Sequence, residues 1–85
     1  MNIGDNVSYS NEYGEKIRGV ISNVHSDMDS YDEMRLENGV PLYYSKKLSR
    51  FVPVKKKNMA SVFLEIDRGR NSCPDFIGFN KACEE

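Results

Sequence analysis

Residues 37–54 read ENGVPLYYSKKLSRFVPV, and this run decides the fold more than any other part of the chain. The pair Asn38-Gly39 supplies the positive φ values that a two-residue type I′ turn requires, so it predicts a tight hairpin. Before the turn, Met34 and Leu36 alternate with charged residues, which is the pattern of a half-buried strand.

The strand after this turn alternates in the same way. Val40, Leu42 and Tyr44 share one side of it, and Tyr43 lies on the other. Pro41 cannot donate a backbone hydrogen bond, so we expect its side of the strand to be an edge or to face solvent.

The following segment, Ser45 to Arg50, is too short and too polar for a full helix. It fits a single 3₁₀ turn in which Leu48 points inward and pins the last strand to the core. Phe51 to Val54 then form a short final strand.

Two more strands are expected nearer the N-terminus. In residues 6–10, Val7 and Tyr9 alternate with polar residues. Residues 16–25 carry four apolar residues at helical spacing, but all four are β-branched, which favours a strand. Gly19 would weaken a helix, whereas in a strand it fits a bulge or a bend, so we expect a long, bent strand.

Five short strands, with a 3₁₀ turn before the last, describe a mainly β chain that forms a small closed barrel, because closure removes exposed edges. The run Gly4 to Val7, the element Gly19 to Ile21 and residues 40–54 resemble the SH3-like small barrels, a group that includes Tudor and KOW modules. The resemblance covers about residues 3–54. It implies a five-stranded SH3-like barrel and, for KOW-like members, the binding of RNA or protein.

The tail, residues 55–85, lies outside the resemblance. Asn58 is a suitable N-cap for a short helix that ends at Gly69, and a strand over Val62–Ile66 is the alternative. A second apolar cluster consists of Phe76, Ile77 and Phe79. Within a single domain, we expect this extension to pack on the barrel of residues 1–54, or to bind a partner.

The net charge of −1 hides a segregation of charge along the chain. Residues 1–37 hold three basic and eight acidic side chains, whereas residues 38–64 hold six basic side chains and no acidic one. Residues 65–85 return to a net charge of −2. The pI near 5.8 argues against strong nonspecific binding of nucleic acid, because domains built for it are usually basic overall.

The acid-free stretch is the strongest functional signal, because aromatic residues are interleaved with its cations. Such cations can neutralise the phosphates of a nucleic acid, and such rings can stack on its bases. The alternative is that the lysines simply belong to a solvated turn and a solvated linker. Tyrosines near the barrel loops also suggest a Tudor-like cage for methylated cations. The residues assigned to partner binding are Tyr13, Tyr31, Tyr43, Lys46, Lys47, Arg50, Lys55, Lys56 and Lys57.

Patterns of catalysis and metal binding are weak in this sequence. His25 is the one imidazole that could activate a nucleophile, so no catalytic residue is assigned. Cys73 and Cys83 with one histidine cannot complete a zinc site, and we expect free thiols, with a disulfide as the alternative. Residues 27–33 lack the turn glycine of a calcium loop. We therefore expect no metal, no cofactor and no enzymatic activity.

The sequence thus predicts a non-enzymatic β-barrel that acts as a protein-interaction module. An accessory or inhibitory protein of a phage or mobile element would have this character. The alternative is a KOW-like or Tudor-like barrel that binds nucleic acid through residues 46–57. The first ten residues, MNIGDNVSYS, lack the basic and apolar regions of a secretory signal, and no apolar run approaches a membrane span, so a cytoplasmic location is expected.

Overall fold

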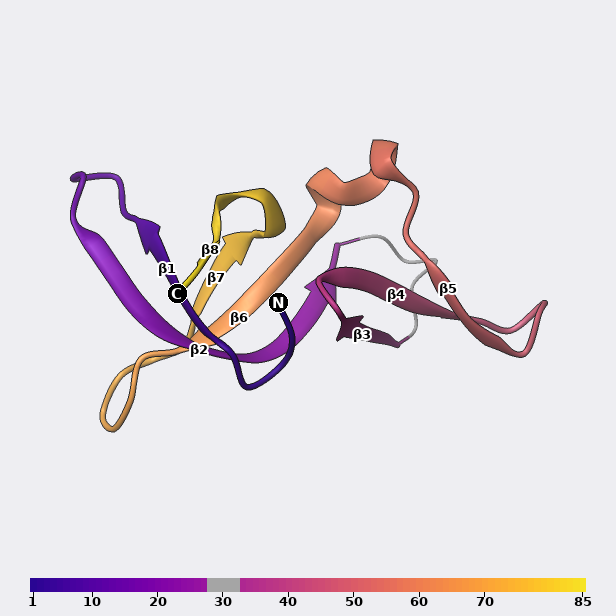
Figure 1. Ribbon diagram of the computed structural model, residues 1–85, viewed down its shortest axis with the longest axis horizontal. Coiled ribbons are helices and arrows are strands. Elements are labelled where there is room, and N and C mark those ends of the chain that lie inside the picture. The colour runs from indigo at the N-terminus through magenta and orange to yellow at the C-terminus, as the bar shows by residue number, and fades with distance from the viewer. Residues whose placement is uncertain (28–32) are drawn as a thin grey trace.

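The computed structural model describes residues 1–27 and 33–85, and their strands form two antiparallel sheets (Figure 1). One sheet has five strands in the order β7-β6-β2-β1-β8, and the other has three in the order β3-β4-β5. The prediction of a mainly β chain is confirmed. The elements are β1 Asn6–Ser10, β2 Lys16–Ser26, β3 Met34–Glu37, β4 Val40–Ser45, β5 Arg50–Pro53, the 3₁₀ helix η1 Lys56–Ser61, β6 Val62–Asp67, β7 Asp75–Gly78, the 3₁₀ helix η2 Phe79–Lys81 and β8 Cys83–Glu84.

The described strands do not close into the five-stranded barrel that the sequence led us to expect. β2 pairs with β1 through residues 16–20 and, on its other edge, with β6 through residues 20–26. Among the described strands, β3 pairs with β4 and β4 with β5, and these three form a separate sheet.

The strand that fills the second edge of β2 belongs to the tail. The expected helix after Asn58 is wrong, and the alternative of a strand over Val62–Ile66 is confirmed by β6. Val62, Leu64 and Ile66 occur at every second position and are all fully buried, which is the pattern of one strand face against a core. The tail therefore supplies three of the five strands of the larger sheet.

The prediction of a long, bent strand over residues 16–25 is confirmed by β2, but its bulge is not at Gly19. The register shifts between Ile21 and Asn23 instead. Gly19 serves a close approach: a Cβ atom there would clash with the side chain of Ile66 and lie 2.7 Å from the carbonyl oxygen of Asp67. A glycine is therefore required because β6 crosses β2 tightly at this point.

The Asn38-Gly39 hairpin is confirmed, with φ values of 52° and 78° and Glu37 opposite Val40. The expectation for Pro41 is wrong, since its ring is fully buried in the middle strand of the smaller sheet. Its carbonyl accepts a hydrogen bond of 3.0 Å from the N–H of Val54, so Pro41 still contributes one backbone hydrogen bond to the sheet.

The segment Ser45 to Arg50, where we expected a 3₁₀ turn, instead holds a second hairpin turn: residues 46–49 join β4 to β5. The 3₁₀ helices lie further along the chain, at η1 and η2. The expectation that Leu48 is buried is wrong, because 53% of its surface is exposed. The hairpin extends beyond the core, so the turn has no apolar surface on which Leu48 could pack.

Most of the core lies on the inner face of the larger sheet, where Leu36 of β3 and Val54 after β5 join residues of β1, β2 and β6. The buried apolar residues of the core are Val7, Tyr9, Ile21, Val24, Leu36, Val54, Val62, Leu64 and Ile66. Of the tail's apolar cluster, Ile77 and Phe79 pack against this core, whereas Phe76 is 58% exposed.

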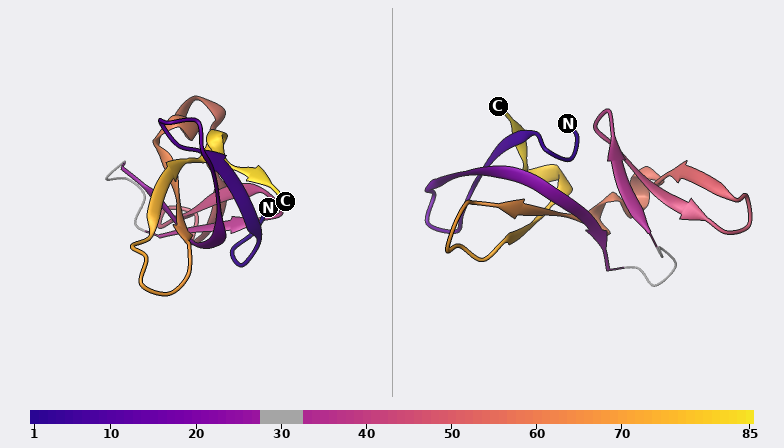
Figure 2. Two further views of the ribbon diagram at one scale, coloured as in Figure 1. Left: turned by 90° about the vertical axis from the view of Figure 1, so that its left-hand side faces the viewer. Right: turned by 90° about the horizontal axis from the view of Figure 1, so that it is seen from below.

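The molecule is elongated, with principal extents of 42, 24 and 21 Å. Its radius of gyration is 13.2 Å, against about 12 Å expected for a compact chain of this length. Figures 1 and 2 show the reason: the three-stranded sheet projects from one end of the five-stranded sheet. No helix in the described part of the chain has the length and apolar character needed to cross a membrane.

Candidate interaction surface

The tip of the β4–β5 hairpin is the most distinctive surface of the molecule, and Figure 1 shows it at the far end of the long axis. Lys46 and Lys47 lie in the turn and Arg50 begins β5, all three exposed. The turn is ordered locally: the N–H of Leu48 donates to Oγ of Ser45 at 3.3 Å. We call residues 46–50 the basic tip.

The basic tip concentrates positive charge on a narrow projection. Three cations fall within five residues, and the sequence contains no acidic residue from position 38 to position 64. Among the described acidic residues of the small sheet, Glu33 is paired nearest to the basic tip, since its carbonyl accepts a hydrogen bond from the N–H of Tyr44 at 3.0 Å. Surface charge of one sign attracts oppositely charged partners from about one Debye length, roughly 8 Å at physiological salt.

The nine residues assigned to partner binding fall in separate places. Lys46, Lys47 and Arg50 share the basic tip, and Tyr43 lies on the core side of the same hairpin, packed against the core. Lys55 precedes η1, and Lys56 and Lys57 lie within it. Tyr13 is 78% exposed in the connection from β1 to β2, at the opposite end of the molecule (Figure 1). Tyr31 lies outside the described residues.

This arrangement does not provide a Tudor-like cage from the described tyrosines. Tyr9 is buried, and Tyr13 and Tyr43 belong to opposite ends of the fold. A cation–π contact within the small sheet is internal: the guanidinium of Arg35 lies 4.2 Å from the ring centroid of Phe51. Tyr44 meets the same ring edge-on at 5.3 Å, so Phe51 is already engaged on the sheet surface.

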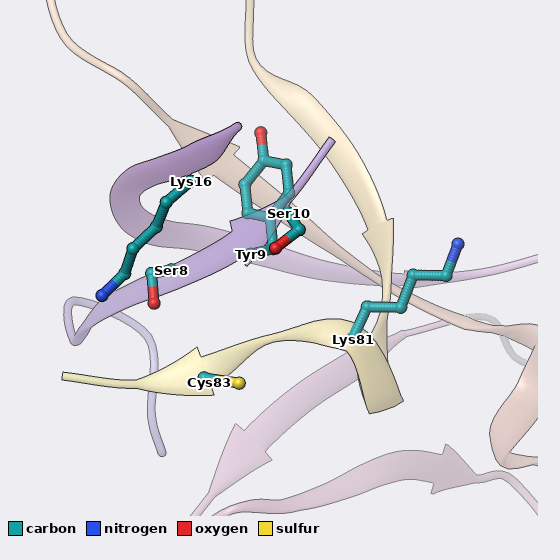
Figure 3. Close-up of a pocket in the computed structure, with 6 residues that line it drawn as sticks. All are labelled: Ser8, Tyr9, Ser10, Lys16, Lys81 and Cys83. Carbon is teal, nitrogen blue, oxygen red and sulfur yellow. The ribbon is translucent and has the colours of Figure 1, made fainter. Parts of the chain in front are cut away.

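A cavity of about 380 Å³ opens beside β1, η2 and β8, and Figure 3 shows the residues that line it. Lys16 and Lys81 stand on opposite sides, with Ser8, Ser10 and Cys83 between them. Nζ of Lys16 lies 3.6 Å from Oε1 of Glu85, so its charge already has a carboxylate partner. The polar groups do not converge on one point, as the groups of a small-molecule site usually do.

Ser22, Glu65 and His25 form a cluster on the outer face of the larger sheet. Oγ of Ser22 lies 2.8 Å from Oε2 of Glu65, and Nε2 of His25 lies 3.2 Å from Oε1 of the same residue. A nucleophile needs the imidazole next to the hydroxyl, with the carboxylate behind the imidazole. Here the carboxylate stands between the two, so His25 is not placed to take the proton of Ser22.

Metal ligands do not gather among residues 1–27 and 33–85, where no group of three or more histidine, cysteine or acidic side chains could hold an ion. Cys73 and Cys83 are both exposed, unpaired thiols.

Comparison with protein-family models, curated proteins and solved structures gives no match for this chain. The likeness to SH3-like barrels therefore rests on the quoted residues alone.

One surface of interest escaped the sequence analysis: the outer face of the three-stranded sheet. The alternation of Val40, Leu42 and Tyr44 was visible, but the pattern alone could not show which side of the strand the core covers. The buried residues Leu36, Pro41 and Val54 place the core on the opposite side. The three alternating residues consequently lie together on the outward side of β4.

Proposed function

We propose that the protein is a non-enzymatic protein-interaction module, and that the basic tip binds an acidic surface of a partner protein. The observation that carries the proposal is the hairpin itself, which holds Lys46, Lys47 and Arg50 exposed at the end of a projecting sheet. Such a projection reaches a partner without steric conflict from the rest of the fold.

Leu48 supplies the apolar part of this contact. Its side chain is 53% exposed and lies between Lys47 and Arg50 in the sequence of the turn. Interfaces commonly combine a small apolar centre with a polar rim that excludes water. In that arrangement the cations mainly speed and orient association, while burial of Leu48 adds affinity.

Affinity capture from a cell lysate with matched charge variants tests this proposal. The triple variant Lys46→Glu, Lys47→Glu, Arg50→Glu reverses the tip, and Lys55→Glu, Lys56→Glu, Lys57→Glu makes the same change of charge beside and within η1. We expect a protein that the wild type and the η1 variant retain, that the tip variant loses, and that nuclease treatment leaves bound. Equal loss from both variants, or loss on nuclease treatment, would contradict the proposal.

Nucleic-acid binding is the second candidate, favoured by the six cations of residues 46–57. Against it, three of them lie at the basic tip and three at η1, so they do not line one groove. Fluorescence anisotropy with single- and double-stranded oligonucleotides at two salt concentrations separates the candidates. We expect no binding below about 100 μM at physiological salt. Micromolar binding, weakened when Lys55, Lys56 and Lys57 become glutamine, would favour nucleic acid.

A further inference from the structure

The outer face of the three-stranded sheet is an apolar surface with a polar border. Cross-strand pairing places Val40 with Glu37, Leu42 with both Arg35 and Pro53, and Tyr44 with Phe51. Paired residues of antiparallel strands share one face, so these seven residues form a single surface. We call it the outer face.

The apolar residues of the outer face are only partly covered. Val40 is 42% exposed, Pro53 is exposed, and Leu42, Tyr44 and Phe51 are half-buried. Within the described residues, η1 makes its main contacts with η2 and β6 rather than with this sheet, and the core lies on the sheet's other side. A small sheet gains stability when a second layer covers its apolar face.

The charges on the outer face are self-complementary. Nη2 of Arg35 lies 3.1 Å from Oε2 of Glu37, and the two side chains are 51% and 55% exposed. A two-fold interface brings a surface against its own copy, so each charge on it needs an opposite charge on the same surface. One arginine and one glutamate beside an apolar centre meet that requirement, whereas the basic tip, with cations only, does not.

We infer that two copies of this chain associate through their outer faces, with Arg35 of one copy near Glu37 of the other across a two-fold axis. This inference is independent of the proposed function, because the partner protein is assigned to the basic tip and the second copy to the outer face.

The size of the outer face limits the strength of the dimer. Three strands span about 14 Å with their side-chain margin, and the six residues of β4 about 20 Å. A face of these dimensions has a much smaller area than the roughly 800 Å² per partner of a standard interface. We therefore expect a weak dimer, with a dissociation constant of about 10–100 μM.

Sedimentation equilibrium over a range of concentrations up to about 500 μM tests the dimer, with two matched variants. Val40→Arg places a charge among the apolar residues of the outer face, beside the Asn38-Gly39 turn. Val20→Arg makes the same change on a strand of the larger sheet, where Val20 is 37% exposed. We expect wild type and Val20→Arg to approach twice the monomer mass and Val40→Arg to stay monomeric. A wild type that remains monomeric throughout would overturn the inference, and so would equal behaviour of the two variants.

A charge-pair experiment locates the contact more closely. Arg35→Glu leaves two acidic residues on the outer face, and Glu37→Arg leaves two basic ones, so each variant should repel itself. An equimolar mixture should associate at least about ten-fold more tightly than either variant alone, because an acidic outer face then meets a basic one. Since a variant that merely unfolds gains nothing on mixing, a mixture no tighter than its components would contradict the two-fold contact.

Discussion

The phenol of Tyr9 on β1 donates a hydrogen bond to the carboxylate of Asp75 on β7, although β6 and β2 separate these strands in the sheet. In a flat sheet, three strand spacings would hold β1 and β7 about 14 Å apart. The larger sheet is therefore strongly coiled, so that β7 and β1 meet across its inner face. Nε of Arg68 lies 3.2 Å from the same Asp75 oxygen and completes the link.

This link predicts a loss of stability at alkaline pH. Burial, followed by the hydrogen bond to Asp75, raises the pKa of Tyr9 from 10.0 to about 12. The folded state thus favours the protonated phenol, and this preference adds to the free energy of unfolding. The added stability is complete below pH 10 and is lost as the pH rises towards 12. Its upper limit is about 3 kcal/mol, because each pKa unit corresponds to about 1.4 kcal/mol.

Urea unfolding at a series of pH values checks this prediction. Tyr9→Phe should lower the free energy of unfolding at neutral pH by about 1 kcal/mol, the usual net value of one hydrogen bond. Between about pH 10 and pH 12 the wild type should lose this difference, because the phenol of Tyr9 ionises there. All other groups are shared by the two proteins, so the comparison isolates Tyr9. A constant difference across that range would show that the Tyr9 phenol does not titrate as described.

Gly19 should not tolerate a side chain. Gly19→Ala places a methyl group against Ile66 and the Asp67 carbonyl, so we expect a loss of about 1–3 kcal/mol, as for other overpacked sites. Gly78→Ala is the matched control, because nothing lies within 4 Å of a Cβ atom there and its φ is −60°. Thermal unfolding of both variants measures the contrast, and equal melting temperatures would mean that β2 and β6 do not approach this closely.

Leu48 and Leu64 should differ sharply in their contribution to stability. Leu64 is fully buried in β6, so Leu64→Ala should cost about 2–5 kcal/mol in urea denaturation. Leu48→Ala at the exposed tip should cost less than about 0.5 kcal/mol. A large loss at Leu48 would place the turn against the core and remove it from the proposed contact surface.

The tail should be necessary for folding. A fragment that ends at Lys57 lacks β6, and with it Val62, Leu64 and Ile66 of the core and one partner of β2. We expect its amide proton spectrum to show the narrow dispersion of an unfolded chain. A dispersed spectrum from a monomeric 1–57 fragment would mean that the first five strands can fold alone.

The sequence predicted the first five strands well because their signals are local. Alternation in β1 and β3, the Asn38-Gly39 turn and the β-branched residues of β2 each favour one structure. β6 was harder, since Val62, Phe63 and Ile66 fit a helical stripe while Val62, Leu64 and Ile66 fit a strand. Only pairing with β2 selects the strand.

The candidate surfaces divide in the same way. The cations at positions 46, 47 and 50 could be predicted, because a charged turn stays at the surface in almost any fold. The outer face could not, since alternation shows that Val40, Leu42 and Tyr44 share a side but not which side the core covers. Tertiary packing of Leu36 and Val54 on the opposite side settles that question.

Site-specific photo-crosslinking can show whether the basic tip contacts a protein. Replacing Leu48 with a photoreactive phenylalanine analogue leaves Lys46, Lys47 and Arg50 in place. The control is the same replacement at Tyr13, which is 78% exposed at the opposite end of the molecule. After illumination in cells, we predict a protein adduct of defined mass from position 48 and none from position 13. An adduct from position 13 alone, or a nucleic-acid adduct from position 48, would contradict the account.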